Sequence, residues 1–344
     1  MPLTIYYPDR ILNRNTGGNT TYTRMISKGV EDLGFDIGTI PSGRHPAITL
    51  ARETAFGQRR RDHSIIHYSA DTGPLVSTRT PSVVTIHGVA SRWEKSIRSP
   101  WQERVWRTRV SAAARSCDAV ISVSSSSADD VASVFEIDRS IIHVIPHGID
   151  VEAFQSPEPL STELAERTGD RYILFVGNLE PRKNLRALAA GYRESRLERE
   201  GVKLVVAGKP AWNSDEIVHD LSTTPGVELL GFVTDRERIA LMQHCALFAF
   251  PSLYEGFGFP VLEALAAGTV VIASDRGALR DVAGPSLRFT DIDSTSISSG
   301  LLLGISNEDA RANVVASGRK WARSFSWKQS YLAHAKVYES VASA

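Results

Sequence analysis

Continuous runs of apolar and β-branched residues alternate along the chain with segments in which apolar residues recur at helical spacing. The runs that predict strands are residues 3–7, 64–68, 82–86, 118–123 and 141–145, and then 172–176, 202–207, 227–230, 246–250 and 269–273. Helical patterns lie between them, over residues 19–33, 101–116, 128–135, 184–197, 215–221, 235–244 and 260–267. Strands that are apolar along their whole length and alternate with helices predict parallel sheets covered on both faces.

The series of strands is interrupted at residues 155–160, which contain two prolines and form the best candidate for a linker. We therefore expect an α/β protein of two Rossmann-like, doubly wound domains that face each other across a cleft, at residues 1–156 and 157–326. Beyond Asp293 the pattern is helical to the end of the chain. Asp291 and Asp293 precede this helical region, so we expect capping there rather than metal binding.

The composition is that of an ordinary globular protein. The 344 residues include 39 Lys+Arg and 39 Asp+Glu, and 42% of them are hydrophobic. This neutrality argues against a nucleic-acid partner, and no apolar run reaches the ~20 residues of a transmembrane helix. The first residues lack the basic segment of a signal peptide, and Cys117 and Cys245 are too few for a disulfide framework or a multi-cysteine metal site. We expect a cytoplasmic protein.

The most specific motif is the string EGFGFPVLEA at residues 255–264, which follows a predicted buried strand. Pro260 suits the first position of a helix, and Gly256 and Gly258 allow the backbone to approach a ligand closely. The amides at a helix start favour an anion, and Glu255 and Glu263 flank them. Carboxylates accept hydrogen bonds from hydroxyls, so a sugar and a ribose are candidate ligands. A lone Gly-x-Gly would more simply be a surface turn, and the third glycine of a dinucleotide fingerprint is absent.

A second motif is the string FVGNLEPRKNL at residues 175–185. A predicted strand ends at Gly177 and a predicted helix starts near Asn184, so Arg182 and Lys183 stand close to a helix N-terminus. Arginine, lysine and free amides together suit a diphosphate. The alternative is an exposed basic pair in a turn.

Three weaker signals lie in the first half of the chain. Gly17 and Gly18 follow the first predicted strand and open a helix, which by itself indicates only a turn. His87 follows the strand at residues 82–86 and is expected to project from its carboxyl end. A lone histidine is more often structural than catalytic, and we interpret His147 as structural, with Gly148 as the turn.

Together these motifs resemble the retaining glycosyltransferases of the GT-B fold, especially family 4 (glycosyltransferase group 1). The resemblance implies that Glu255 contacts the donor sugar and that Glu263 contacts the ribose. Arg182 and Lys183 would hold the diphosphate and stabilise the charge that develops on it as it departs. His87 would touch the donor sugar, although the acid that commonly follows it in the family is a glycine here.

The resemblance extends to further residues. It places the loop of Gly17 and Gly18 between acceptor and donor phosphate, and it implies that a helix at residues 327–344 packs back on the first, acceptor-side domain. The string at residues 179–184 looks like mannosyltransferases of bacterial surface-polysaccharide pathways. The other donor contacts implied are Gly177, Lys209, Val233, Gly256, Phe257, Gly258, Phe259 and Leu262.

The function that the resemblance implies is transfer of a sugar, with retention, from a nucleoside-diphosphate sugar to a glycan, lipid-linked or small-molecule acceptor. The mannosyltransferase-like string favours GDP-mannose over a UDP-sugar, and we expect no metal or other cofactor. A sugar-nucleotide epimerase of the same fold and a non-catalytic sugar-nucleotide-binding subunit are the alternatives. The oligomeric state stays open.

The predicted helix at residues 101–116 is basic on one face, where Arg104, Arg107 and Arg115 align. The opposite face is apolar and includes Val110 and Ala113. The simple interpretation is an amphipathic helix with its arginines in water. The alternative is that residues 92–115 form a basic surface for the anionic inner face of a membrane.

Overall fold

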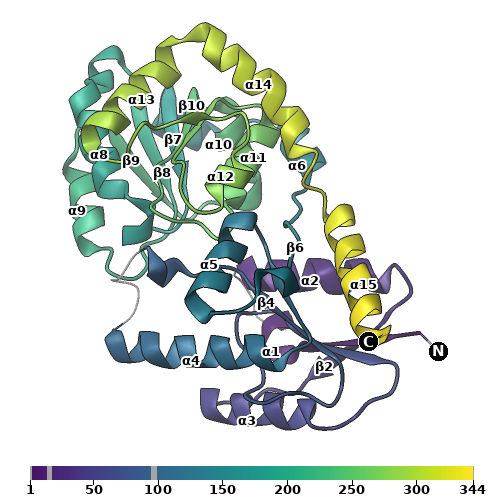
Figure 1. Ribbon diagram of the computed structural model, residues 1–344. Coiled ribbons are helices and arrows are strands. Elements are labelled where there is room, and N and C mark those ends of the chain that lie inside the picture. Colours follow the sequence, from purple (N-terminus) through teal and green to yellow (C-terminus); the bar gives the residue numbers. More distant parts are fainter. Residues whose placement is uncertain (1, 14–17, 94–98, 344) are drawn as a thin grey trace. The chain divides into compact units, whose positions relative to one another are not determined.

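The computed structural model describes residues 2–13, 18–93 and 99–343. These residues form two compact units (Figure 1). Unit 1 comprises Met1–Gly148 together with Phe325–Ala344, and unit 2 comprises Ile149–Ser324. Each unit holds one six-stranded parallel sheet with helices on its faces, as the alternating pattern predicts.

The sheet of unit 1 has the strand order β2-β1-β3-β4-β5-β6. Its strands are β1 (Thr4–Pro8), β2 (Asp36–Ile40), β3 (Ser64–Tyr68), β4 (Ser82–Ile86), β5 (Ala119–Ser122) and β6 (Ile142–Val144). Its α-helices are α1 (Asp9–Leu12), α2 (Gly18–Glu31), α3 (Pro46–Gly57), α4 (Pro100–Ser116), α5 (Ser125–Phe135) and α15 (Trp327–Ser343). The strand order changes direction between β1 and β3, which marks the place where such folds bind ligands.

Unit 1 is apolar on both sides of its sheet because successive side chains of a strand point to opposite faces. Ile65 of β3 packs in the layer under α2 and α15, whereas its neighbour Ile66 packs in the layer under α4 and α5. Helix α15 lies against α2 and β3. The two helices approach closely at Gly29, where a Cβ would lie 2.1 Å from Cδ1 of Tyr331. The last helix therefore returns to the first sheet, as the resemblance implies.

The sheet of unit 2 has the strand order β12-β11-β10-β7-β8-β9. Its strands are β7 (Tyr172–Val176), β8 (Lys203–Ala207), β9 (Val227–Gly231), β10 (Leu247–Phe250), β11 (Val271–Ala273) and β12 (Leu287–Arg288). Its α-helices are α6 (Val151–Gln155), α7 (Thr162–Thr168), α8 (Leu185–Ser195), α9 (Asp215–Thr223), α10 (Asp235–His244), α11 (Phe259–Ala267), α12 (Leu279–Val282), α13 (Ser294–Ser306) and α14 (Glu308–Ala322). The order changes direction between β7 and β10.

The structure adds elements that the apolar pattern does not predict. Strand β2 is an edge strand with the sequence DIGTI, so no continuous apolar run marks it. Helix α6 is capped by Asp150, whose side chain accepts from the amide of Ala153, and it packs on α10 and α11. The chain consequently enters unit 2 at Ile149, ahead of the proline-containing segment 155–160.

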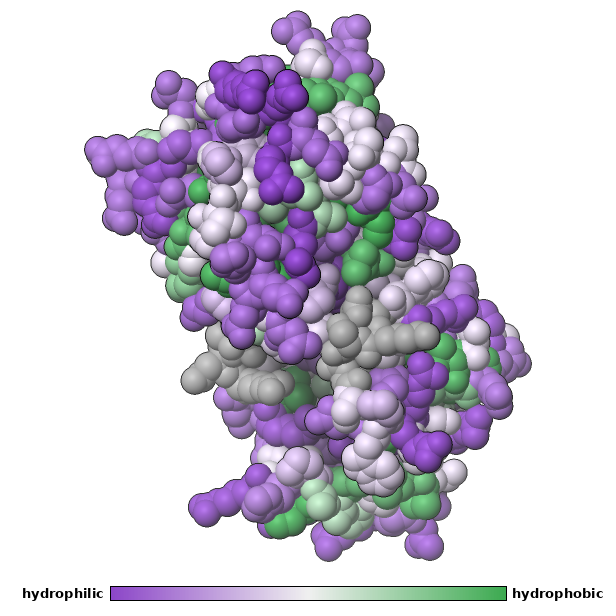
Figure 2. All heavy atoms as spheres, turned by 90° about the vertical axis from the view of Figure 1, so that its left-hand side faces the viewer, coloured by the Kyte–Doolittle hydropathy of each residue, from purple (hydrophilic) through white to green (hydrophobic). Residues whose placement is uncertain are grey.

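The capping predicted at Asp293 is confirmed, and Ser124 caps a second helix. Ser124 accepts a hydrogen bond from the amide of Ser127 at the start of α5. Asp293 accepts one from the amide of Ser296, at 2.9 Å, at the start of α13. In the view of Figure 2 hydrophilic side chains cover most of the surface, and hydrophobic ones form small scattered patches. In the described part of the chain, no helix combines the length and the apolar character needed to cross a bilayer.

Candidate functional site

The two strongest sequence motifs lie next to each other in unit 2. One follows β7 and the other follows β10, and these parallel strands are neighbours, with Leu247 beside Ile173. The carboxyl ends of neighbouring parallel strands meet at one edge of a sheet, and here that edge is the switch point of the strand order. The two loops are joined directly, since the amide of Leu253 donates to the carbonyl of Arg182 at 2.9 Å.

A buried cluster of charges forms where the loops meet. Lys183 Nζ lies 2.7 Å from Glu255 Oε1, and Arg182 Nη1 lies 2.8 Å from Glu255 Oε2. The same Nη1 donates to the carbonyl of Tyr254 at 2.8 Å. Lys183 and Glu255 are each only 7% exposed. An exposed basic pair in a turn, the simple alternative for Arg182 and Lys183, is therefore wrong.

Glu180 completes this cluster and was not predicted as a site residue. Its Oε1 accepts from Arg182 Nη2, and its Oε2 accepts from Nε1 of Trp212 at 2.9 Å. Glu180 stands in the second motif, two residues before Arg182. The pattern gave no sign that it would turn back onto Arg182, because that contact depends on the conformation of the loop.

The pKa values follow from burial and charge pairing. Burial raises the pKa of Glu255, but the charges of Arg182 and Lys183 outweigh it and hold that pKa at about 2. Burial lowers the pKa of Lys183, and Glu255 offsets part of that effect. Burial also lowers the pKa of Arg182, but Glu255 and Glu180 reverse this and raise it. The cluster thus pairs two carboxylates with two cations, and an arriving anion would compete with the carboxylates.

Glu263 of α11 is held by a residue that the sequence did not single out. Arg238 of α10 donates from Nη1 to both oxygens of Glu263, each at 3.0 Å, and its Nη2 lies 3.1 Å from Asp235. Burial raises the pKa of Glu263, and the charge of Arg238 opposes this. Glu263 is 7% exposed, so its carboxylate is fixed in direction.

Glycines let the backbone pass closely at this edge of the sheet. Gly208 follows β8 with φ +156°, and a Cβ there would lie 1.9 Å from the carbonyl oxygen of Gly177, which follows β7 with φ +154°. Gly258 precedes α11 with φ +99°. A side chain at any of these positions would strain the backbone and close the space along the loops.

The other predicted donor residues of unit 2 fall into two groups. Phe257 and Leu262 are buried in the core beside Gly256 and Phe259, so their side chains pack within the unit. Lys209 follows β8, and its Nζ lies 4.3 Å from the ring centroid of Phe232, which follows β9 and is 67% exposed. Val233 is the next residue after Phe232.

The remaining predicted residues belong to unit 1. His87 is half-buried at the end of β4, its Nε2 lies 3.0 Å from the carbonyl oxygen of Ser69, and its amide donates to Asp71. Gly18 opens α2 and faces open space, while Gly17 lies outside the described residues. The structure thus brings Glu255, Arg182 and Lys183 together in one unit and puts His87 and Gly18 in the other.

Behind His87 lies a buried network of uncharged groups. Tyr22 Oη lies 2.7 Å from His334 Nε2 and 2.8 Å from Thr85 Oγ1. His67 lies 2.7 Å from both Thr85 Oγ1 and Tyr338 Oη. Burial lowers the pKa of His67, and it lowers that of His334 to about 4. His147 is buried as well and stacks on His87, with ring centroids 5.4 Å apart, which agrees with its structural interpretation.

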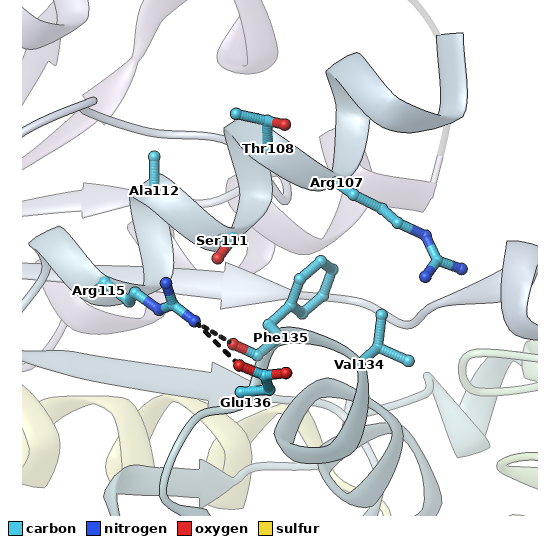
Figure 3. A pocket seen from close by; sticks show the side chains of 8 residues that line it. All are labelled: Arg107, Thr108, Ser111, Ala112, Arg115, Val134, Phe135 and Glu136. Carbon is cyan, nitrogen blue, oxygen red and sulfur yellow. Dashed lines mark hydrogen bonds and ion pairs between the residues drawn. The ribbon is translucent and has the colours of Figure 1, made fainter. Parts of the chain in front are cut away.

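Helix α4 has the predicted buried face, on which Val110 and Ala113 are fully enclosed. Its outer face borders an open pocket of about 480 Å³ between α4 and the end of α5 (Figure 3). Arg115 turns toward α5, donating to the carbonyl of Phe135 at 3.0 Å and lying 3.9 Å from Glu136. Residues 94–98 of the expected basic surface lie outside the described residues.

Solved structures share the fold along nearly the whole chain. Anabaena HepE in complex with UDP and glucose has a TM-score of 0.75 at 16% identity, with 98% of this chain and 100% of that one covered. Sucrose-phosphate synthase from Thermosynechococcus elongatus has a TM-score of 0.76 at 16% identity, covering 98% and 99%. The fold is that of the GT-B glycosyltransferases, as the resemblance implies.

Sequence comparisons reach the same class. The model for glycosyl transferases group 1 matches residues 158–321, and the model for glycosyltransferase family 4 matches residues 16–153. The MMP α-(1→4)-mannosyltransferase of Mycolicibacterium hassiacum is 28% identical over 315 residues, which are 85% of this chain and 74% of that protein. The O-antigen chain mannosyltransferase B of Escherichia coli is 33% identical over 162 residues, 46% of this chain and 42% of that protein. The chain is a family 4 glycosyltransferase similar to mannosyltransferases.

Proposed function

We propose that the protein transfers a sugar, with retention, from a nucleoside-diphosphate sugar that binds in unit 2. The observation that carries this is the buried cluster of Arg182, Lys183 and Glu255 at the switch point of the sheet. Two cations that share one buried carboxylate can take a diphosphate in its place. Glu255, released from them, can then accept hydrogen bonds from sugar hydroxyls.

The other residues of unit 2 fit the same donor. Glu263, held in direction by Arg238, is our candidate for the ribose hydroxyls. Lys209 and Val233, on neighbouring loops, are candidates for the phosphate and the base, and the backbone from Gly256 to Phe259 is a candidate for the sugar and phosphates. For Gly17, Gly18 and His87 of unit 1, the support is the family resemblance.

In the reaction that we propose, the acceptor attacks the sugar on the same face from which the nucleoside diphosphate departs. The acceptor oxygen bonds to the anomeric carbon as the bond from that carbon to the β-phosphate oxygen breaks, and the acceptor proton passes to the departing phosphate. Arg182 and Lys183 stabilise the charge that develops on this phosphate. No metal is needed for this role, because two fixed cations supply the positive charge.

For the donor we propose GDP-mannose. The names of the mannosyltransferase relatives support mannose as the sugar, and the choice of GDP rests on the family resemblance of the string at residues 179–184. For the acceptor we propose a glycan or a lipid-linked sugar of surface polysaccharide or glycoconjugate biosynthesis. Another relative is the phosphatidyl-myo-inositol mannosyltransferase of Mycolicibacterium smegmatis, 31% identical over 206 residues, which are 58% of this chain and 52% of that protein.

We also propose that the outer face of α4 contacts an anionic membrane surface. Trp101 is 71% exposed and Val105 39%, and Arg104 and Arg115 on this helix are exposed as well. Apolar side chains flanked by arginines suit the boundary between lipid headgroups and acyl chains. Co-sedimentation with anionic and neutral liposomes tests this: we expect preference for anionic vesicles that Arg104→Glu weakens, and equal binding to both would contradict it.

The donor site is tested by the thermal stability of the protein against GDP, UDP, ADP and dTDP, each beside its monophosphate. A ligand that binds only the native state adds about 2.7 kcal/mol at 100 times its Kd. We expect a clear shift with GDP, and GDP-mannose should then be consumed only when an acceptor is present. A shift with another diphosphate in its place would overturn the choice of GDP. Conversion of the sugar nucleotide without an acceptor would favour the epimerase, and no shift at all would favour a protein without a working donor site.

A further inference from the structure

The carboxylates of Glu180 and Glu255 differ in the groups that hold them in place. Both carboxylates are buried beside Arg182, with Glu180 8% and Glu255 7% exposed. Each oxygen of Glu255 pairs with a cation, Lys183 or Arg182. Glu180 instead gives one oxygen to Arg182 and the other to the indole N–H of Trp212. An anion can take the cations away from Glu255, but it offers nothing that replaces the donor from Trp212.

The loops that carry Glu180 and Trp212 are bound to each other through their backbones. The amide of Leu179 donates to the carbonyl of Lys209 at 2.9 Å, and the amide of Ala211 donates to the carbonyl of Leu179 at 3.0 Å. In the first loop this bridge lies between the end of β7 and Glu180. In the second loop it lies between the end of β8 and Trp212. The Glu180 carboxylate therefore has a fixed position relative to both β7 and β8.

We propose that Glu180 is a positioning residue for the diphosphate clamp. It anchors one side of the Arg182 guanidinium through Nη2 while Nη1 passes from Glu255 to the diphosphate of the donor. The anchored guanidinium keeps its plane and offers to the phosphate the N–H of Nη1 that leaves Glu255, without having to find that orientation anew. This role rests on the proposed function of the cluster as the donor diphosphate site.

Simple electrostatics predicts the opposite effect of removing Glu180. Taking one negative charge away from a site that binds an anion should strengthen the binding of a diphosphate. The positioning role predicts weaker binding, because the guanidinium loses the anchor on Nη2 and keeps only the Tyr254 carbonyl on Nη1. Glu180→Gln separates the two, since it keeps the side-chain volume and removes the charge. Arg182 and Trp212 donate to different oxygens of Glu180, so in glutamine an NH2 group, which cannot accept, replaces the acceptor of one of them.

The experiment is calorimetric titration of the full-length protein with GDP, UDP, GMP and UMP. For Glu180→Gln we expect the Kd of the diphosphate that the wild type prefers to rise by about tenfold, the equivalent of ~1.4 kcal/mol, while the Kd of its monophosphate stays within about twofold. Trp212→Phe removes one N–H from the anchor, so we expect a smaller rise in the same direction, about two- to fivefold. Glu228→Gln is the control. Glu228 lies on the edge strand β9 of the same unit and pairs with Arg167, so this substitution should change neither Kd.

The outcomes separate the two proposals. If the wild type binds no diphosphate better than its monophosphate, the proposed function fails. If it does, and Glu180→Gln binds the diphosphate as well as or better than the wild type, the positioning role fails. An equal loss for the monophosphate and the diphosphate would also overturn it, because that indicates a general disturbance of the loops. Should Glu180→Gln not fold, Trp212→Phe carries the same test, with an unchanged diphosphate Kd as the contradicting result.

Discussion

Each unit buries a set of polar side chains, and the two sets are built differently. In unit 2 the set is charged: Glu255 is shared between Arg182 and Lys183. In unit 1 it is uncharged: Tyr22 bonds to His334 of α15 and to Thr85, and His67 bonds to the same Thr85, in a network between α15 and the sheet. A closed network of neutral groups fixes a helix on a sheet. A shared buried carboxylate leaves its cations able to change partners when an anion arrives, which is what a binding site requires.

The largest effect should come from breaking the charged set. Lys183→Ala removes one of the two cations that would stabilise the departing diphosphate, and we expect kcat to fall by about 10²- to 10³-fold. The measurement is release of the nucleoside diphosphate from the preferred sugar nucleotide. Lys203→Ala is the matched control. Lys203 stands at the start of β8, and its Nζ donates to the carbonyl of Arg167 and not to the cluster. Turnover of Lys183→Ala at the wild-type level would refute the electrostatic role.

Acid should separate the two sets. His334 has a pKa of about 4 in the native protein against 6.5 when unfolded, so the unfolded state binds more protons as the pH falls below 6.5. The stability present above pH 6.5 is lost toward pH 4, by about 3 kcal/mol for this histidine. The pKa of Glu255 is lowered from 4.5 to about 2, so its contribution is lost only between pH 4.5 and 2.

Hydrogen exchange measured by mass spectrometry, corrected for the intrinsic effect of pH, checks this order. Peptides of α15 should lose protection between pH 6.5 and 4.5, while peptides of α11 keep theirs. Equal loss in both helices over that range would contradict the difference between the two sets.

A single hydroxyl tests how closed the neutral network is. Tyr22→Phe removes the group that joins His334 to Thr85 and leaves a buried ring nitrogen without this partner. We expect a loss of about 1–3 kcal/mol in the free energy of unfolding, measured with denaturant. Tyr331→Phe, whose ring packs against Gly29 at the contact of α15 with α2, is the control and should change it by less than about 0.5 kcal/mol. A change for Tyr22→Phe no larger than that of the control would argue that the network contributes little.

The smallest effect should come from helix caps, which exist in both units and belong to neither set. Ser124 accepts from the amide of Ser127 in unit 1, and Thr234 accepts from the amide of Glu237 in unit 2. Replacing either by alanine should cost about 1 kcal/mol, with the same cost at pH 7 and pH 5. Neither hydroxyl titrates, and the Glu237 carboxylate that Thr234 also bonds has a pKa lowered by this bonding, so it stays charged over this range. A cost that depends on pH would show that the acid effect is not specific to the buried histidines.

The architecture was predictable from the sequence because buried parallel strands are apolar along their whole length. Residues 64–68, 82–86 and 172–176 are strands with the predicted bounds. The edge strand β2 was missed because half of it faces solvent and no run of apolar residues marks it. Helix α6 was missed because it is only five residues long.

The site residues were predictable where they lie within a short sequence motif that follows a strand. Arg182, Lys183 and Glu255 follow buried strands, and parallel strands bring such loops to one edge of a sheet. The partners that hold them were not predictable: Glu180 with Trp212, and Glu263 with Arg238, meet through loop conformations and helix faces that no local spacing encodes. His87 came from the resemblance, and the structure explains only its support by Ser69 and Asp71.

In our proposal the buried charges of unit 2 change partners when the donor binds. The most direct test is an experimental structure of the protein with the nucleoside diphosphate that shifts its melting temperature, or with the corresponding sugar nucleotide. We expect phosphate oxygens about 3 Å from Lys183 Nζ and from the Arg182 guanidinium, with Glu255 turned away from both. A nucleotide bound elsewhere, with the Lys183–Glu255 and Arg182–Glu255 pairs still at 2.7 and 2.8 Å, would contradict it.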